Sequence, residues 1–131
     1  NMIARGGGKI LNIAAGVIDE RVELGVAAYC VSKAGLVNFT RQLAAEVKRY
    51  GIFVNAIDPG GLETAMTDQL NQSRETSDAW ISAQQVEEEL RLRSPEEITP
   101  LVMFLVSDDS NMMTGRFLQA SSRGNPFYLQ L

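Results

Sequence analysis

Two short apolar stretches, separated by a long helical segment, constrain the fold of this 131-residue chain most strongly. "KILNI" (9–13) and "IFVNAI" (52–57) have the length and the apolar, β-branched character of buried strands. The second is almost continuously apolar, as parallel strands covered on both faces tend to be. A strand, a helix and a strand in this order form a right-handed crossover unit, so the sequence predicts an α/β fold with a parallel sheet.

The segment between these strands, residues 26–50, predicts one long helix. Gly51 follows it directly, at the position where a glycine commonly ends a helix in the left-handed conformation. Apolar residues recur along the helix at intervals of three or four, and we expect them to face the core. They are Leu36, Phe39, Leu43 and Val47.

The rest of the chain predicts a polar extension, a second helix and one further strand. After a turn at "DPGG" (58–61), residues 62–93 are polar and only loosely helical. "SPEE" predicts a helix over 95–108 with its serine as N-cap, although Thr99–Pro100 is an equally good start. A third strand is expected over 115–120. Three strands make a thin parallel sheet, so we expect half of a domain.

The composition excludes several classes of function. A net charge of −4 does not provide the basic surface that nucleic-acid binding needs. The longest apolar run, "PLVMFLV", has seven residues, far below the roughly 18 of a membrane-spanning helix. There is no histidine and Cys30 is the only cysteine, so neither a metal site nor histidine-based catalysis is expected. A lone cysteine cannot form an internal disulfide, and we expect a cytoplasmic protein.

One pair of polar side chains is notable at the start of the long helix. In "AAYCVSKAG" (27–35), Tyr29 and Lys33 are four residues apart, and positions i and i+4 share a helix face. Tyrosine titrates near pH 10, so its pKa must fall by about 2 units, roughly 3 kcal/mol, before it acts as a base near neutral pH. An ammonium about 5 Å away, at an effective dielectric of about 20, supplies that amount. The alternative is a surface tyrosine beside a solvated lysine.

Four segments occur in an order that resembles one enzyme family. They are "ILNIAAG" (10–16), "YCVSK" (29–33), "VNAIDPGGLET" (54–64) and "FLVSDDSNMMTG" (104–115). Together they resemble the C-terminal half of the short-chain dehydrogenase/reductase family. The resemblance implies a Rossmann-type doubly wound parallel sheet, of which this chain would form the C-terminal half.

The same resemblance implies an oxidoreductase that uses NAD or NADP and acts on an alcohol or carbonyl. Tyr29 would exchange a proton with the substrate oxygen, and Lys33 would hold the hydroxyls of the nicotinamide ribose. Hydride would pass directly between substrate and nicotinamide. The turn after the second strand would contact the nicotinamide and its carboxamide, although it is also explained as a plain strand-to-loop connection. The residues implied there are Pro59, Gly60, Leu62 through its backbone, and Thr64 through its hydroxyl.

Residues 62–93 would then be the lid over a small-molecule substrate, because loops carry specificity on such scaffolds. Candidates for the substrate pocket are Ala15, Gly61 and Met66, with Leu70 and Trp80 farther along the lid. The apolar residues of the lid are equally well explained as packing a helix onto the body of the domain.

Two departures from the family pattern leave a second function open. The family expects a serine where this chain has Ala15, and there is no serine or threonine between Asn1 and Ala28. Loss of one such donor typically lowers turnover by about 10² to 10³. The glycine-rich nucleotide-binding loop of the family does not occur in this sequence. The alternative is a catalytically impaired or inactive relative, or a fragment that binds no cofactor alone.

The resemblance also implies a homodimer or homotetramer, formed through the long helix and through the last helix and strand. Small residues on the long helix would permit close packing there, or would serve the cofactor side instead. They are Ala27, Ala28, Ala34 and Gly35. Nucleic acid and membrane are not expected as partners.

Overall fold

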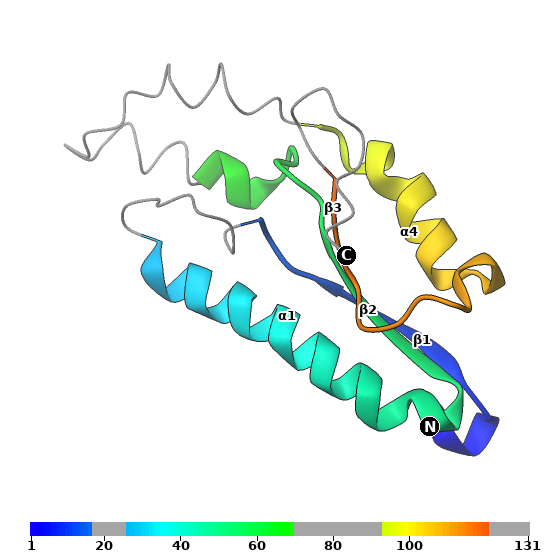
Figure 1. Ribbon diagram of the computed structural model, residues 1–131. Helices are drawn as coiled ribbons and strands as arrows, with labels where there is room; N and C mark the ends of the chain where they lie inside the picture. Colours follow the sequence, from blue (N-terminus) through cyan, green and yellow to red (C-terminus); the bar gives the residue numbers. More distant parts are fainter. Residues whose placement is uncertain (17–25, 70–92, 121–131) are drawn as a thin grey trace.

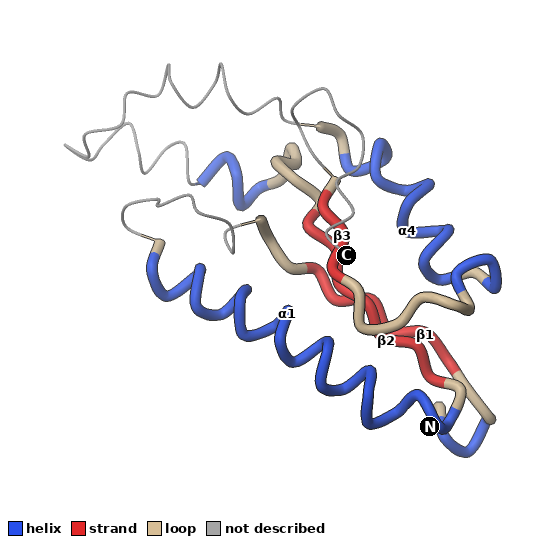
Figure 2. The backbone as a smooth tube through the Cα atoms, viewed as in Figure 1, coloured by secondary structure: helices blue, strands red, loops and turns tan. Residues whose placement is uncertain are grey.

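The computed structural model describes residues 1–16, 26–69 and 93–120 of the chain. Its centre is a parallel sheet of three strands in the order β1–β2–β3 (Figure 1). A long helix, α1, lies along one face of this sheet, and a shorter helix, α4, lies on the other (Figure 2). The predicted α/β fold with a doubly wound parallel sheet is therefore confirmed.

The strands are aligned so that their carboxyl ends share one edge of the sheet. β1 is Gly8–Ile13, β2 is Ile52–Asp58 and β3 is Phe117–Gln119. Ile13 is the register partner of Ile57, and Asp58 is the partner of Gln119. β3 is shorter than the predicted 115–120 at both ends. Gly115, with φ of 71°, is in the left-handed conformation and lies before the strand.

α1 spans Ala27–Val47 and continues as a 3-10 turn, η2, at Lys48–Tyr50. Gly51 ends this turn with φ of 68°, the left-handed C-cap predicted for it. The end of the helix packs its Ala44 on Ile52 and Val54 of β2. Another 3-10 turn, η1, lies at Ile3–Arg5, before β1.

The buried face of α1 is centred one residue away from the predicted stripe. Its buried residues are Val37, Thr40 and Ala44, while Phe39 is 54% exposed, so the prediction for Phe39 is wrong. Two of these buried positions hold a threonine and an alanine, which are not large apolar residues and therefore do not mark a core face in the sequence. Thr40 is buried because its hydroxyl donates to the Leu36 carbonyl and accepts a hydrogen bond from Asn12 Nδ2 on β1.

α4 spans Thr99–Val106 and buries Leu105 against Ile57 and Leu118, on the face of the sheet opposite α1. The predicted helix over 95–108 is thus three elements, with 3-10 turns η3 at Pro95–Ile98 and η4 at Asp108–Ser110 on either side of α4. Both predicted starts are used. Ser94 and Glu97 form a capping box at η3, and Pro100 lies in the first turn of α4, where its missing N–H costs nothing. The Ser94 hydroxyl, with a backbone N–H, holds the pKa of the exposed Glu96 below its usual value.

Candidate active site

The candidate site lies at the edge where the strands end. β1 is followed there by Ala14–Gly16, and β2 by the turn at residues 59–62. The Ala14 N–H donates to the Ile57 carbonyl at 2.7 Å, so the segment that follows β1 remains paired with β2. In open parallel sheets this edge is where ligands bind.

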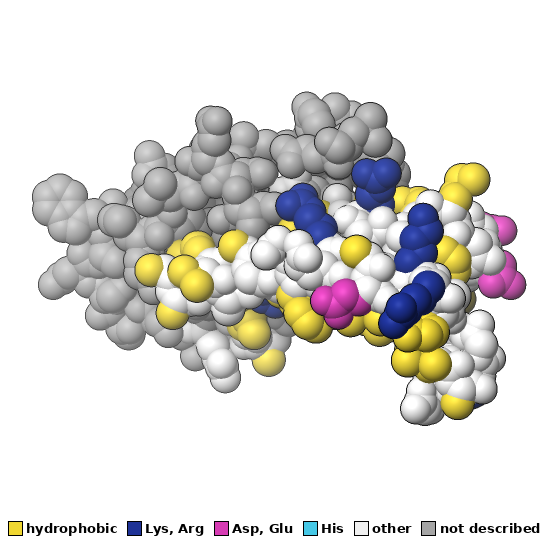
Figure 3. Space-filling model, turned by 60° about the horizontal axis from the view of Figure 1, so that its bottom comes forward, with side chains coloured by type: hydrophobic (Ala, Val, Ile, Leu, Met, Phe, Trp, Pro, Cys, Tyr) yellow, Lys and Arg dark blue, Asp and Glu magenta, His cyan; other side chains and the backbone are white. Residues whose placement is uncertain are grey.

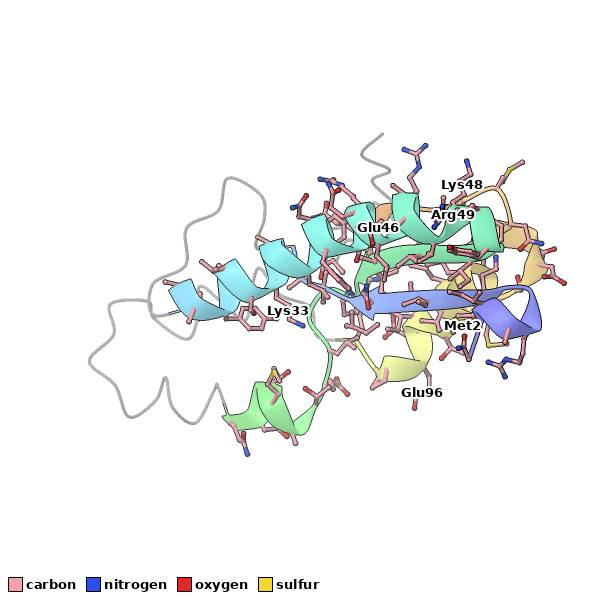
Figure 4. All side chains as sticks on the ribbon, turned by 90° about the horizontal axis from the view of Figure 1, so that it is seen from below. Met2, Lys33, Glu46, Lys48, Arg49 and Glu96 are labelled. Atoms are coloured by element: carbon pink, nitrogen blue, oxygen red, sulfur yellow. The ribbon has the colours of Figure 1, made fainter. Side chains whose placement is uncertain are left out.

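Tyr29 and Lys33 lie on the first two turns of α1 and are in contact. Lys33 Nζ is 5.6 Å from the centroid of the Tyr29 ring. It also donates a hydrogen bond of 2.9 Å to the carbonyl of Ile13, at the end of β1. Figure 4 shows the Lys33 side chain on α1. Tyr29 itself is 40% exposed. The structure therefore brings the predicted pair together, and it brings Lys33 to the end of the first strand.

The Lys33 ammonium is suited to hold the hydroxyls of a ribose. An ammonium carries three N–H donors and no acceptor. One donor is used on the Ile13 carbonyl, which fixes the nitrogen at the sheet edge. The others can be donated to hydroxyl oxygens of a ligand. The chemistry of this donor fits the ribose of a nicotinamide cofactor.

The turn after β2 has a backbone that only glycine adopts easily at one position. Gly60 has φ of 73°, and a Cβ there would lie 2.8 Å from the Ala120 carbonyl oxygen. The Gly60 N–H donates to Asp58 Oδ1 at 2.9 Å, and Pro59 is buried. The turn is therefore held by the Asp58 carboxylate and packed against the Ala120 carbonyl, and only a glycine fits at position 60.

Two threonines organise the chain just beyond this turn. Thr67 Oγ1 donates to the Leu62 carbonyl at 2.6 Å, and the Thr67 N–H donates to Thr64 Oγ1 at 3.3 Å, which caps the helical residues 65–69. Thr67 has only one hydroxyl proton and uses it on Leu62, so in the 3.1 Å contact between the two hydroxyls Thr64 is the donor. Thr64 Oγ1 also accepts from the Thr67 N–H, so it keeps one lone pair that could accept a hydrogen bond from the NH2 of a carboxamide.

The two ends of the predicted lid are joined to each other. The Glu63 N–H donates to the Arg93 carbonyl at 2.9 Å, and the Arg93 N–H donates to the Gly61 carbonyl at 3.0 Å. These bonds do not use the Leu62 N–H, the backbone donor that the family resemblance assigns to the nicotinamide. Leu70 and Trp80 lie outside the described residues.

The three candidates for the substrate pocket differ in their surroundings. Ala15 and Gly61 are half-buried, Ala15 just after β1 and Gly61 just after the turn at Gly60. Met66 is 64% exposed on the helical residues 65–69. The described structure thus brings Ala15 to the same sheet edge as Lys33, while Met66 lies farther along the lid.

Sequence reasoning missed two residues that hold this site in shape, Asp58 and Thr67. An Asp two residues before a glycine at a strand end is a recognisable Asx-turn signal, and a threonine pair three residues apart is a helix-start signal. Both signals are common in loops that have no ligand, which is why neither was distinctive.

The described residues contain no group of three or more His, Cys, Asp or Glu side chains that could hold a metal ion. Among the same residues, no helix is long and apolar enough to cross a membrane.

Comparison with known proteins decides the family. A family model described as enoyl-(acyl carrier protein) reductase matches residues 1–122. The acetoacetyl-CoA reductase of Allochromatium vinosum is 40% identical over 114 residues, which are 87% of this chain and 44% of that protein. The chain belongs to the short-chain dehydrogenase/reductase family. Another member, the 3-oxoacyl-(acyl-carrier-protein) reductase of Rickettsia prowazekii, is 33% identical over 92% of this chain and 47% of that protein.

Solved structures of the short-chain dehydrogenase/reductase family agree with this assignment. A variant of actinorhodin polyketide ketoreductase, solved with NADPH, superposes with a TM-score of 0.77 at 32% identity, over 90% of this chain and 47% of that one. The described sheet and helices are therefore those of a Rossmann-type fold. The chain spans about half the length of the curated relatives that it matches.

Proposed function

We propose that the protein containing this chain is an NAD(P)-dependent oxidoreductase that interconverts an alcohol and a carbonyl compound. The observation that carries the proposal is the contact of Lys33 with Tyr29, made while the same ammonium is bonded to the Ile13 carbonyl at the end of β1. A phenol and a cation held together at the ligand-binding edge of a parallel sheet suit proton transfer to a substrate oxygen.

The residues divide the work between proton transfer and binding. A nicotinamide cofactor, when bound, supplies or accepts the hydride. In the reducing direction Tyr29 gives its hydroxyl proton to the substrate oxygen, and in the oxidising direction it takes that proton back. The positive charge of Lys33 stabilises the phenolate that remains. Lys33 would hold the ribose, and the nicotinamide would be held by the turn after β2, through Pro59, Gly60, Leu62 and Thr64.

A 3-oxoacyl thioester is the substrate class that we propose to try first. The names of the acetoacetyl-CoA and 3-oxoacyl-(acyl-carrier-protein) reductases both describe reduction of such a compound. We propose Ala15, Gly61 and Met66 as residues of its pocket, because two of them flank the sheet edge at which Lys33 is held.

The test is made on the whole protein that contains this chain. Titration with NADPH and with NADH, followed by cofactor fluorescence, is expected to show saturable binding of at least one of them. Addition of acetoacetyl-CoA to the loaded protein is expected to consume the reduced cofactor, with one 3-hydroxyacyl product formed per cofactor oxidised. Absence of cofactor binding would reject the proposed function. Binding without turnover of any ketone would favour the second candidate below.

The second candidate is a family member with weak or lost catalysis, and Ala15 favours it. A hydroxyl donor beside the tyrosine stabilises charge on the substrate oxygen, and an alanine methyl cannot do this. No serine or threonine occurs between Asn1 and Ala28 to replace it. This candidate differs from the first in one measurable respect, because it binds cofactor without rapid turnover.

We also propose that the protein assembles as a homodimer or homotetramer through the outer face of α1. Ala27, Ala28, Ala34 and Gly35 are all exposed, and a Cβ at Gly35 would meet no atom within 4 Å. Val31 is 73% exposed on the same helix. Small and apolar side chains cover the N-terminal part of this face, while Lys and Arg side chains gather toward its other end (Figure 3). The single cysteine agrees with a reducing compartment, so we propose the cytoplasm as the location.

The assembly has a direct test in the exposed apolar residues of α1. Val31→Glu and Phe39→Glu each place a charge on the outer face of the helix, and we expect each to weaken association by about 2 kcal/mol or more, roughly 30-fold. Sedimentation velocity of the whole protein measures this. Ile3→Glu is the matched control, because Ile3 is a 51% exposed apolar residue outside α1. An unchanged mass distribution in both α1 variants would exclude this face as the interface.

A further inference from the structure

We infer that Asp58 is a positioning residue, whose carboxylate holds the turn at Gly60 in its ligand-binding shape and locks that turn to the end of β1. The inference rests on the proposed function, because it assigns the turn to the nicotinamide. Asp58 itself contacts neither the cofactor nor the substrate in this account. It acts through the backbone of Gly60 and through the space beside Gly16.

One oxygen of the carboxylate fixes the turn. Asp58 Oδ1 accepts a hydrogen bond of 2.9 Å from the Gly60 N–H. Gly60 is in the left-handed region, with φ of 73°, and a glycine is free to adopt several other conformations there. Bonds from an amide N–H to a charged acceptor are stronger than neutral ones, so this contact favours the observed turn over other conformations.

The other oxygen occupies the space that a side chain at position 16 would need. A Cβ built on Gly16 would lie 2.5 Å from Asp58 Oδ2 and 3.2 Å from Gln119 Nε2. The backbone that follows β1 therefore passes directly against the carboxylate. Only a residue without a side chain permits this approach while Asp58 keeps its position.

The sheet explains why the Asp58 carboxylate lies beside the segment that follows β1. Asp58 is the last residue of β2, the middle strand, and Gln119 is its register partner on β3. Side chains alternate along a strand, and Ala56 packs on Val37 of α1, so Asp58 projects from the same face of the sheet as Ala56. Gly16 follows the buried Ala14 of the same cluster by two residues.

The consequence is a mechanical link between the two parts of the candidate site. The chain after β1 carries Ala15 and follows the carbonyl that binds Lys33, and the chain after β2 carries the turn assigned to the nicotinamide. Because the segment after β1 passes against the carboxylate that bonds the Gly60 N–H, a displacement of that carboxylate by either segment is expected to reach the other. Removal of the carboxylate is expected to weaken binding of the cofactor more than binding of the substrate.

The experiment is a double-mutant cycle on the whole protein, made of Asp58→Ala, Gly16→Ala and the two combined. We expect Asp58→Ala to weaken NADPH binding by about tenfold, the equivalent of about 1.4 kcal/mol, measured by fluorescence titration. The KM for NADPH should rise similarly, and the KM for the ketone should change much less. Gly16→Ala alone should weaken NADPH binding to a similar degree, because its methyl group displaces the carboxylate. In the Asp58→Ala background the same methyl group should cost little, so the two effects are not additive.

The conservative variant and a remote control separate positioning from general damage. Asp58→Asn keeps an oxygen that accepts from the Gly60 N–H and should retain NADPH affinity to within about threefold. Asp108→Ala removes an exposed carboxylate on η4 and should leave the affinity unchanged. Thermal unfolding of the cofactor-free variants shows whether each is folded. Should Asp58→Ala fail to fold, Asp58→Asn and Gly16→Ala still test the link, since the inference requires the first to bind well and the second poorly.

Several results would overturn the inference. If the unmodified protein binds NADPH and folded Asp58→Ala binds it equally well, the positioning role of Asp58 is rejected and the proposed function is not affected. Additive effects of Asp58→Ala and Gly16→Ala would show that the carboxylate and the β1 end are not linked. Equal losses in Asp58→Asn and Asp58→Ala would reject the role of the Gly60 hydrogen bond. An unmodified protein that binds no nicotinamide cofactor would instead reject the proposed function, and this inference with it.

Discussion

Tyr29→Phe is expected to lower ketone turnover by about 10² to 10⁴, the range attributed to a single acid–base group, with little change in NADPH affinity. The ring remains beside Lys33, so the packing at the start of α1 is kept, and only the proton-bearing hydroxyl is lost. Stopped-flow measurement of NADPH oxidation in the whole protein separates the chemical step from binding. The expected signature is a fall in kcat without a matching rise in the KM for NADPH.

Tyr50→Phe is the matched control for this substitution. Tyr50 lies in η2, directly before β2, and so at the opposite end of that strand from the candidate site. The centroid of its ring is 4.7 Å from the Arg49 guanidinium, and the ring packs beside Ala44 and Ile52. Its hydroxyl has no role in the proposed reaction, so turnover should be unaffected. If Tyr29→Phe retains full turnover, the proposed mechanism is wrong, whatever the cofactor affinity.

Ala15→Ser is expected to raise turnover by about 10² to 10³ if the missing hydroxyl is what limits this protein. Ala15 is half-buried just after β1, two residues beyond the carbonyl that holds Lys33, so a hydroxyl there lies at the sheet edge of the candidate site. The measurement is kcat with acetoacetyl-CoA at saturating NADPH, before and after the substitution. A gain of this size would support the reading of an impaired family member.

Ala14→Ser controls for the position of the new hydroxyl. Ala14 is only 3% exposed and packs with Val37, Ala56 and Phe117, so a hydroxyl there is buried among apolar groups. It should lower stability and bring no gain in turnover. If Ala15→Ser also brings no gain, the alanine is not the defect, and another donor already serves the substrate oxygen or the reaction is a different one.

The fold could be predicted from the sequence where the signal is local. The almost continuous apolar run of β2, the long helix before it and the left-handed Gly51 depend on neighbours in the chain, and the structure has each of them. The error at Phe39 has a different origin. Which stripe of α1 is buried depends on where the helix rests on the sheet, and Thr40 is buried because Asn12 on β1 binds its hydroxyl.

The candidate site likewise has one contact between near neighbours in the sequence and others that depend on the tertiary structure. The contact between Tyr29 and Lys33 follows from their spacing of four residues on a helix. The hydrogen bond from Lys33 to Ile13 spans 20 residues and depends on how α1 crosses the end of β1. The approach of Asp58 to Gly16 joins the ends of two strands and depends on their register.

The sequence by itself determined the order of the strands and helices and the pair of side chains that the proposed chemistry needs, because apolar periodicity and helix spacing act over a few residues. Only the tertiary structure decided which stripe of α1 is buried, where the Lys33 ammonium is anchored and how closely Gly16 approaches the Asp58 carboxylate. The physical reason is that these contacts join residues brought together by the packing of α1 on the sheet and by the pairing of its strands, and no local pattern records such a contact.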